Sequence, residues 1–185
     1  MRRFMPVLRG ALRTVAFFVC LVFALQMLYG VLRLKREDGS LSMEAYYKQP
    51  KNTVDLLVMG SSHAYEGINT TALWTDGGIA AYNLCGSAQP IWNTYYYLRE
   101  ALKTQTPKVI VLDVFKAVDI ADEYGPLTDV YRNTMGIRSP LLRWQSICAG
   151  TGEWGERLSC FFGWPVYHTR YAELKKDDLV KQIEG

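Results

Sequence analysis

Residues 53–67 read TVDLLVMGSSHAYEG, and the organisation of the rest of the chain follows from them. A short apolar run that is rich in branched residues is typical of a buried strand, and this run ends in Gly60, Ser61, Ser62 and His63. Small residues let the backbone turn tightly and expose a hydroxyl group. Because ligands bind where the carboxyl ends of parallel strands open into loops, we expect Ser62 to lie at such a site.

Two more strands are expected, at residues 79–84 and 108–113, and the second is continuously apolar, as parallel strands covered on both faces are. A helix capped by Asn69 should end at Gly77 and Gly78. Further helices should start at Gln89–Pro90 and at Ser139–Pro140. The first of these two has apolar residues at helical spacing, namely Ile91, Tyr95, Leu98 and Leu102.

This alternation of strands and helices predicts an α/β fold, a three-layer domain around a parallel sheet that spans residues 53–185. No fourth strand is visible, and three parallel strands make a small sheet with exposed edges. We therefore expect the domain to be partial and the chain to be an N-terminal fragment.

Residues 15–32 are apolar apart from Gln26, close to the ~20 residues that a helix needs to cross a bilayer. We expect a cytoplasmic basic segment at 1–14, a transmembrane anchor in the lipid bilayer at Val15–Leu32, and a linker at 33–52 with a short helix near Met43–Tyr47. Arginines before the apolar run favour a cytoplasmic N-terminus and an extracytoplasmic domain. The alternative is a cleaved signal peptide, but the run exceeds the usual ~7–15 residues and no Ala-x-Ala-like site follows it.

The charge distribution argues against a nucleic-acid partner. Residues 1–36 hold seven of the 21 Lys and Arg and no acid, which leaves 14 basic against 18 acidic residues in the rest of the chain. A nucleic-acid footprint needs clustered basic residues on the folded part. No metal-ligand spacing and no glycine-rich nucleotide loop is visible, so no metal or cofactor is expected. Cys148 and Cys160 could pair in an oxidising compartment.

Two blocks resemble the SGNH/GDSL hydrolase superfamily over about residues 52–113: Gly60-Ser61-Ser62-His63 after the first strand and Asn83-Leu84-Cys85-Gly86-Ser87 after the second. The nearest branch is the membrane-anchored one related to teichoic-acid D-alanyl transfer proteins and polysaccharide O-acetyltransferases. The resemblance implies an SGNH (flavodoxin-like) fold, with Ser62 as the nucleophile. It also implies that the N–H of Gly86, or of Ser87 if the register shifts by one, binds the oxyanion together with the N–H of Ser62.

The function that the resemblance implies is bacterial, extracytoplasmic hydrolysis or O-acyl transfer at acyl esters of cell-envelope glycans or polymers. A membrane acyl-donor protein is the implied partner. The chain departs from the family in two blocks: Asp113-Val114-Phe115 replaces the third, and the Asp-x-x-His block is absent. Asp113 can touch the site or only cap a turn, and both readings stay open.

A serine needs a base to take its proton, and the chain holds only two histidines. We expect His63 to line the pocket, and a role for it as the base is the less favoured alternative. We expect His168 to be structural. The base of the resembled family would then lie beyond Gly185. The alternatives are a non-catalytic envelope or assembly factor that retains the fold, a plain secreted esterase, or a Gly-Ser-Ser turn around Ser62 that only reverses the chain.

Overall fold

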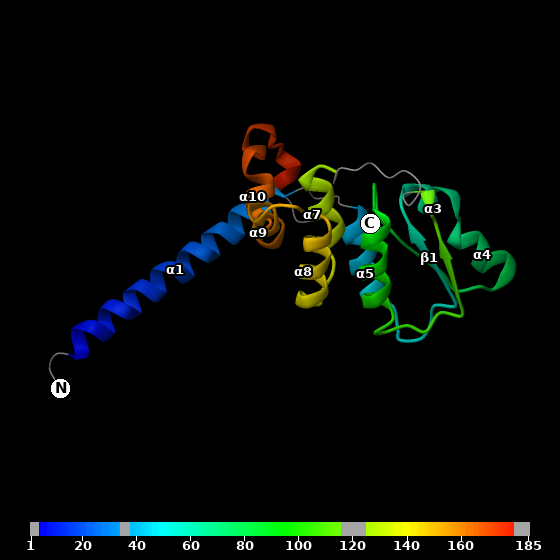
Figure 1. Ribbon diagram of the computed structural model, residues 1–185, viewed down its shortest axis with the longest axis horizontal. Helices are drawn as coiled ribbons and strands as arrows, with labels where there is room; N and C mark the ends of the chain where they lie inside the picture. The colour runs from blue at the N-terminus through cyan, green and yellow to red at the C-terminus, as the bar shows by residue number, and fades with distance from the viewer. Residues whose placement is uncertain (1–3, 34–37, 116–124, 180–185) are drawn as a thin grey trace. The chain divides into compact units, whose positions relative to one another are not determined.

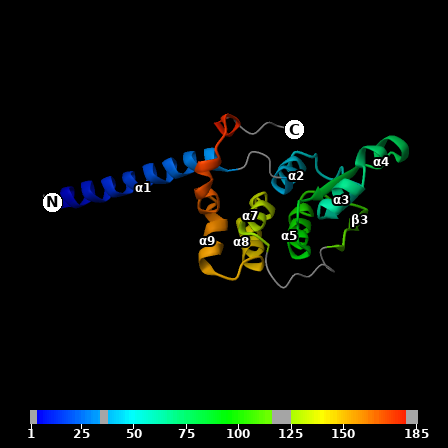
Figure 2. The same ribbon diagram turned by 90° about the horizontal axis from the view of Figure 1, so that it is seen from above.

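A computed structural model describes residues 4–33, 38–115 and 125–179 of the chain (Figure 1, Figure 2). The chain divides into two compact units. The first, called here the anchor unit, comprises Met1–Lys35 and Tyr167–Gly185, and the second, the sheet unit, comprises Arg36–Val166. Each unit is described by itself.

The anchor unit is built on helix α1, which spans Phe4–Leu32. Its segment Arg9–Leu32 has 24 residues with a mean hydropathy of 2.4 and is almost entirely exposed. At a rise of 1.5 Å per residue these residues reach ~36 Å, which exceeds the ~30 Å hydrocarbon core of a bilayer. The chain therefore has an N-terminal helix that is long and apolar enough to cross a membrane.

The helix differs from the expected anchor at its start. We expected the anchor to begin at Val15, but α1 continues toward the N-terminus through Arg13 and Arg9. Arginine is a good helix former, and Pro6 lies in the first turn, where its missing N–H leaves no helical bond unmade. The predicted orientation also rests on basic residues that lie outside the described residues, namely Arg2, Arg3, Lys35 and Arg36.

The sheet unit contains a three-stranded parallel sheet, which confirms the predicted α/β class. Its strands are β1 (Leu56–Gly60), β2 (Ala81–Cys85) and β3 (Val109–Leu112), in the order β2-β1-β3. Strand β1 is in the middle, in register from Leu56 opposite Ala81 to Gly60 opposite Cys85. All three strands therefore end at the same edge of the sheet.

Successive residues of β1 point to opposite faces of the sheet, and each face has its own core (Figure 1). Leu57 and Met59 pack with side chains of helix α2 (Asp38–Tyr47) and helix α5 (Ile91–Ala101). Val58 packs on the other face with Ala64, from helix α3 (Ser62–Gly67). The middle strand is thus covered on both faces, as its apolar sequence predicted.

Strand β3 does not follow that prediction, because it lies at an edge of the sheet. We expected it to be covered on both faces, but Val109, Ile110 and Leu112 are all exposed. Among the described residues, the helices cover mainly β1 and β2.

Helix α4 (Thr70–Gly77) begins and ends as predicted. The Asn69 side chain accepts hydrogen bonds from the N–H groups of Thr71 and Ala72, at 3.0 and 3.1 Å. Gly78 ends the helix in the left-handed conformation, with φ of 64°. Both signals are local, and the prediction of this helix is confirmed.

The apolar residues expected at helical spacing on α5 do not mark its buried face. Tyr95 and Leu102 are exposed, although Leu98 packs against the core. The buried residues are Asn93, Thr94, Tyr97, Glu100 and Ala101. Apolar spacing misses this face because three of the five side chains are polar or charged and are buried with hydrogen-bond partners, which other elements supply to Asn93 and Glu100 and the segment just before the helix supplies to Thr94.

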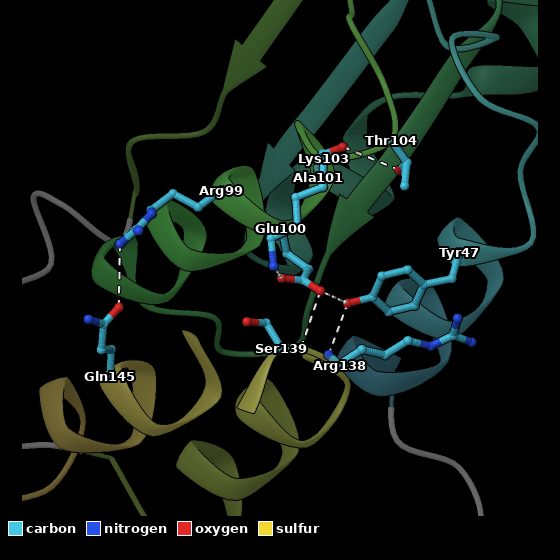
Figure 3. Close-up of polar contacts among 9 residues, drawn as sticks. All are labelled: Tyr47, Arg99, Glu100, Ala101, Lys103, Thr104, Arg138, Ser139 and Gln145. Carbon is cyan, nitrogen blue, oxygen red and sulfur yellow. Dashed lines mark hydrogen bonds and ion pairs between the residues drawn. The ribbon is translucent and has the colours of Figure 1, made fainter. Parts of the chain in front are cut away.

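Glu100 is 4% exposed and joins three segments that are far apart in the sequence (Figure 3). Its Oε1 accepts the hydroxyl of Tyr47 at 2.8 Å and the N–H of Ser139 at 3.3 Å, and its Oε2 pairs with Lys103. The guanidinium of Arg138 lies over the Tyr47 ring, 4.1 Å from its centroid. Burial raises the pKa of Tyr47, so its hydroxyl remains a donor to the carboxylate.

Tyr47 belongs to α2, which changes the interpretation of the expected linker at 33–52. A helix was expected near Met43–Tyr47, but we expected this segment only to separate the domain from the membrane. Met43 and Tyr46 are fully buried in the sheet unit's core. Helix α2 therefore contributes Met43 and Tyr46 to the core, while residues 34–37 of the linker lie outside the described residues.

The remaining helices form a helical layer beside α5. They are α7 (Leu127–Met135), α8 (Pro140–Ala149), α9 (Trp154–Phe162) and α10 (Trp164–Tyr167). The helix predicted to start at Ser139–Pro140 is confirmed as α8. Gly150, at its end, lies against Trp92 of α5, where an added Cβ would be 2.4 Å from the ring. Cys148 and Cys160 are both free thiols in this structure, so the pairing considered from the sequence is not made.

Candidate functional site

The candidate site lies where the three strands end. Gly60 is paired with Cys85 across the β1–β2 ladder, and the N–H of Asp113 donates to the carbonyl of Met59 at 2.9 Å. The loops after β1, β2 and β3 are therefore neighbours, as parallel strands require. This brings together the two blocks that the sequence analysis singled out and also Asp113.

Gly60 is held in a conformation that favours glycine, with φ of +147°. A Cβ built on Gly60 would lie 2.4 Å from the Cβ of Asp113, far inside van der Waals contact. The glycine thus serves two purposes: it turns the chain from β1 into the loop, and it lets the end of β3 approach the loop backbone.

Asp113 is the polar centre of this edge. Its Oδ2 accepts the hydroxyl of Ser61 at 2.8 Å and the N–H of Ser61 at 3.2 Å, and its Oδ1 accepts the N–H of Phe115 at 2.9 Å. Partial burial alone would raise the pKa of Asp113, but these hydrogen bonds and the nearby His63 outweigh it, so the pKa lies below its usual value. Both roles left open for Asp113 are present: Oδ2 contacts the site loop at Ser61, and Oδ1 holds a local turn through the N–H of Phe115.

The two serines of the loop differ in their surroundings. Ser61 is 1% exposed, and besides its bond to Asp113 its Oγ lies 3.4 Å from Nδ1 of His63. Ser62 is the first residue of α3 and is half-buried. Within the described residues, its hydroxyl has no hydrogen-bond partner. Ser61 is therefore placed to organise the loop, and Ser62 is the more accessible of the two serines.

The contact between Ser61 and His63 indicates which nitrogen of the imidazole carries the proton. The single hydrogen of the Ser61 hydroxyl is donated to Asp113, so its oxygen can only accept from Nδ1. A neutral His63 with the proton on Nδ1 leaves Nε2 as its basic nitrogen. The ring is exposed and packs on Phe115, with centroids 3.9 Å apart.

The loop after β2 is also tied to the first loop. The N–H of Gly86 donates to the carbonyl of Gly60 at 3.3 Å. To bind an oxyanion, this N–H would first have to break its hydrogen bond to the carbonyl of Gly60. The thiol of Cys85 donates to the carbonyl of Val58, and burial, with a smaller effect of Asp113, raises its pKa to about 12. Cys85 is therefore held as a thiol and is a poor candidate for a nucleophile.

A buried polar network behind this loop was not anticipated from the sequence. The Asn133 side chain donates to the carbonyl of Ser87 at 3.0 Å, and Asn93 donates to the carbonyl of Asn133 at 2.8 Å. Ser146 in turn donates to Asn93 at 2.6 Å. Helices α5, α7 and α8 thus hold the second loop in place, and because each helix supplies one residue of the network, no pattern in the sequence indicated it.

Other predicted residues lie as follows. Asn83, expected to hold its loop by hydrogen bonds, donates to the carbonyl of Ile68 at 3.0 Å and so ties β2 to the segment after α3. His168 begins the 3-10 helix η1 (His168–Glu173) of the anchor unit, whereas Ser62 belongs to the sheet unit. In the described part of the chain, no three His, Cys, Asp or Glu side chains are grouped to hold a metal ion.

Comparisons of the chain with protein-family models, with curated proteins and with solved structures found no match. The class that the fold and site define is thus an α/β protein with a parallel sheet, a serine-bearing loop at the carboxyl edge of that sheet, and an N-terminal helix able to cross a membrane.

Proposed function

We propose that the chain is a membrane-anchored, serine-dependent acyl-ester hydrolase or O-acyltransferase of the SGNH type, with Ser62 as its nucleophile. The observation that carries the proposal is the meeting of three strand-end loops around Gly60, with Ser62 next to an organised trio of Ser61, His63 and Asp113. The substrate class, acyl esters of cell-envelope glycans or polymers, follows from the family resemblance of the loops.

In the proposed reaction the Ser62 oxygen attacks the acyl carbonyl carbon and gives up its proton to a base. The negative charge that develops on the carbonyl oxygen is met by the N–H of Ser62, at the first position of α3, and by that of Gly86. The N–H of Gly86 can bind the oxyanion only after its hydrogen bond to the carbonyl of Gly60 breaks. The bond between the carbonyl carbon and the ester's alcohol oxygen then breaks, and the alcohol leaves with the proton that the base had taken from Ser62. Water in hydrolysis, or a hydroxyl of the acceptor in transfer, next attacks the acyl–Ser62 ester and gives its proton to the same base, which returns it to the Ser62 oxygen as the acyl group leaves.

His63 is the base that the described residues offer. Its exposed ring, with the proton held on Nδ1 by Ser61, presents Nε2 as the proton acceptor. Asp113 acts through Ser61 and is a positioning residue: its Oδ2 accepts the Ser61 hydroxyl and so fixes the Ser61 oxygen that lies against Nδ1 of His63.

The proposal includes the membrane. Helix α1 crosses the bilayer, its N-terminus is cytoplasmic, and the sheet unit faces outward. Arg9 and Arg13 at the start of α1 support that orientation under the positive-inside rule. An anchored transferase of this kind would receive its acyl group from a membrane acyl-donor protein.

A second candidate function is a non-catalytic envelope or assembly factor with the same fold. One observation favours it: the serine that contacts His63 is the buried Ser61, while Ser62 has no base within hydrogen-bond reach among the described residues. In that case the trio would only hold the loop together.

Release of p-nitrophenol from p-nitrophenyl acetate by the full chain in detergent micelles separates the two functions. We expect Ser62→Ala to abolish the release and His63→Gln to reduce it strongly. Thr71→Ala, at an exposed position of α4, is the control and should have no effect. Release that is the same in Ser62→Ala and the unmodified chain would refute the role of Ser62.

A further inference from the structure

The carboxyl end of α1 is held by the C-terminal segment of the chain. Nη1 of Arg170 donates to the carbonyl oxygens of Leu32 and Arg33, at 2.7 and 3.1 Å. Helix α1 ends at Leu32, and the last carbonyls of a helix need partners from outside its own hydrogen-bond ladder. The other guanidinium nitrogen, Nη2, pairs with Asp178, whose second oxygen accepts the N–H of Lys175 at 2.8 Å.

This arrangement, called here the Arg170 clamp, fixes the position of the whole segment in the anchor unit. The side chains of Arg170 and Asp178 are only 15% and 8% exposed. Helix η1 (His168–Glu173) and the 3-10 helix η2 (Lys176–Leu179) both pack against α1. When α1 crosses a bilayer, its last carbonyls lie at the lipid–water boundary, so residues 168–179 must lie there too.

Three large apolar or aromatic side chains of this segment are exposed and suit that boundary, while the charged side chains of Glu173, Lys175 and Lys176 are exposed as well and can stay in water. Tyr171 is 71% exposed, Leu179 is 75% exposed, and Leu174 lies between them at 38%. Water is a poor environment for such side chains, whereas tyrosine is enriched at membrane interfaces, where its ring is buried and its hydroxyl stays wet. The segment 168–179 carries three basic and three acidic residues, so attraction to anionic lipid is not what would hold it.

We propose that residues 168–179 form an interfacial segment that inserts Tyr171, Leu174 and Leu179 into the lipid surface beside the exit of α1. The Arg170 clamp sets the depth of the insertion. The occupant of this surface is the bilayer itself, and zwitterionic lipid is sufficient because the segment has no net charge. The proposal rests on the membrane-crossing role of α1 given above, and it adds a second membrane contact from the other end of the chain.

Photo-crosslinking tests the proposal in the full chain. The photoreactive residue p-benzoylphenylalanine is placed at one position at a time, as Tyr171→p-benzoylphenylalanine and Leu179→p-benzoylphenylalanine, in nanodiscs of phosphatidylcholine. Phe17, 62% exposed on α1, is the position that reports the membrane anchor, and Trp74, exposed to a similar degree on α4 of the sheet unit, is the water-facing control. Lipid adducts are measured by mass spectrometry.

We expect lipid adducts at positions 171 and 179 as well as at 17, and none above background at 74. Adducts at 17 but not at 171 or 179, or protein–protein adducts at 171, would overturn the interfacial segment and leave the anchor standing. Absence of adducts at all positions would overturn the anchor and the segment together.

The clamp is tested by adding Arg170→Gln to the same chains. Glutamine keeps a hydrogen-bonding side chain but cannot reach two carbonyls and a carboxylate at once. We expect the lipid adducts at 171 and 179 to fall severalfold while those at 17 stay unchanged. Arg157→Gln, an arginine of α9 in the sheet unit, is the matched control and should leave all of them unchanged. Equal adducts in Arg170→Gln and the parent chain would show that the clamp does not set the depth.

Discussion

Replacement of Gly60 by alanine is the most informative perturbation of the site, because it adds one carbon atom at the point where β1, β3 and the serine loop meet. The new Cβ would lie 2.4 Å from the Cβ of Asp113 and 3.0 Å from its Oδ2. The Cβ of Asp113 is attached directly to the backbone, so rotation of the side chain cannot move it away. The backbone of β3 or the loop must therefore move.

The magnitude has two parts. Alanine at a φ of +147° costs about 1–3 kcal/mol in backbone strain, and the overlap with Asp113 adds about 1–3 kcal/mol. We therefore expect Gly60→Ala to lower the free energy of unfolding by about 2–6 kcal/mol, unless the loop relaxes and breaks the Ser61–Asp113 bonds instead.

The assay is urea-induced unfolding of the full chain in detergent micelles, followed by tryptophan fluorescence. All five tryptophans belong to the sheet unit, so the signal reports the unit that contains Gly60. The control is Gly78→Ala, which also has positive φ, at +64°, but has nothing within 4 Å of an added Cβ. A Gly60→Ala chain that is no less stable than Gly78→Ala would refute the close approach of Asp113.

Three further predictions concern the sheet unit. Gly150→Ala should lower the free energy of unfolding by about 1–3 kcal/mol, because its Cβ would meet the tryptophan ring of α5. Gly152→Ala, whose Cβ would have open space around it, should not lower it. Urea-induced unfolding compares the two variants. Tyr47→Phe removes the hydroxyl that donates to the buried Glu100 and should cost about 1–3 kcal/mol in the same assay, whereas Tyr95→Phe, at an exposed position, should cost little. The pKa of Asp113 in the folded chain lies below its unfolded value of ~3.9, so the ionised carboxylate stabilises the fold above that pH, and this stabilisation is lost as the pH falls through the lower, folded pKa. In a profile of unfolding free energy against pH, Asp113→Asn should therefore reduce the loss of stability at acid pH. The same loss in the mutant and the parent chain would contradict the hydrogen bonds to Ser61.

The parts of the fold that sequence reasoning predicted correctly are those set by neighbouring residues. Asn69 and Gly78 mark the ends of α4 because each satisfies or turns the backbone within its own helix. The apolar run before Gly60 predicts a buried strand because its composition alone demands cover on both faces.

The errors concern contacts between residues far apart in the sequence. Glu100 and Asn93 are buried on α5 because Tyr47, Ser139 and Ser146 supply their partners, and no periodicity reveals such partners in advance. The same limit applies to α2 as a whole: the segment was read as a spacer, yet it packs into the sheet unit's core.

The candidate site was predicted in part. The sequence predicted the loop at Gly60–His63, because small residues directly after an apolar strand allow the backbone to turn tightly. It did not reveal that Ser61, rather than Ser62, would bond to Asp113, since that depends on the register of β1 against β3 and on the turn at Gly60. The roles of Ser62 and Gly86 stay predictions.

A fluorophosphonate probe reacts with activated serine nucleophiles, so labelling with it tests the proposed role of Ser62. The full chain in its membrane is treated with the probe, and the modified residue is located by peptide mass spectrometry, with Ser62→Ala and Ser61→Ala in parallel. We predict a single adduct on Ser62 that is lost in Ser62→Ala and retained, at a reduced rate, in Ser61→Ala. An adduct on Ser61, or no adduct on a folded chain, would contradict that role, and the latter result would favour the non-catalytic function.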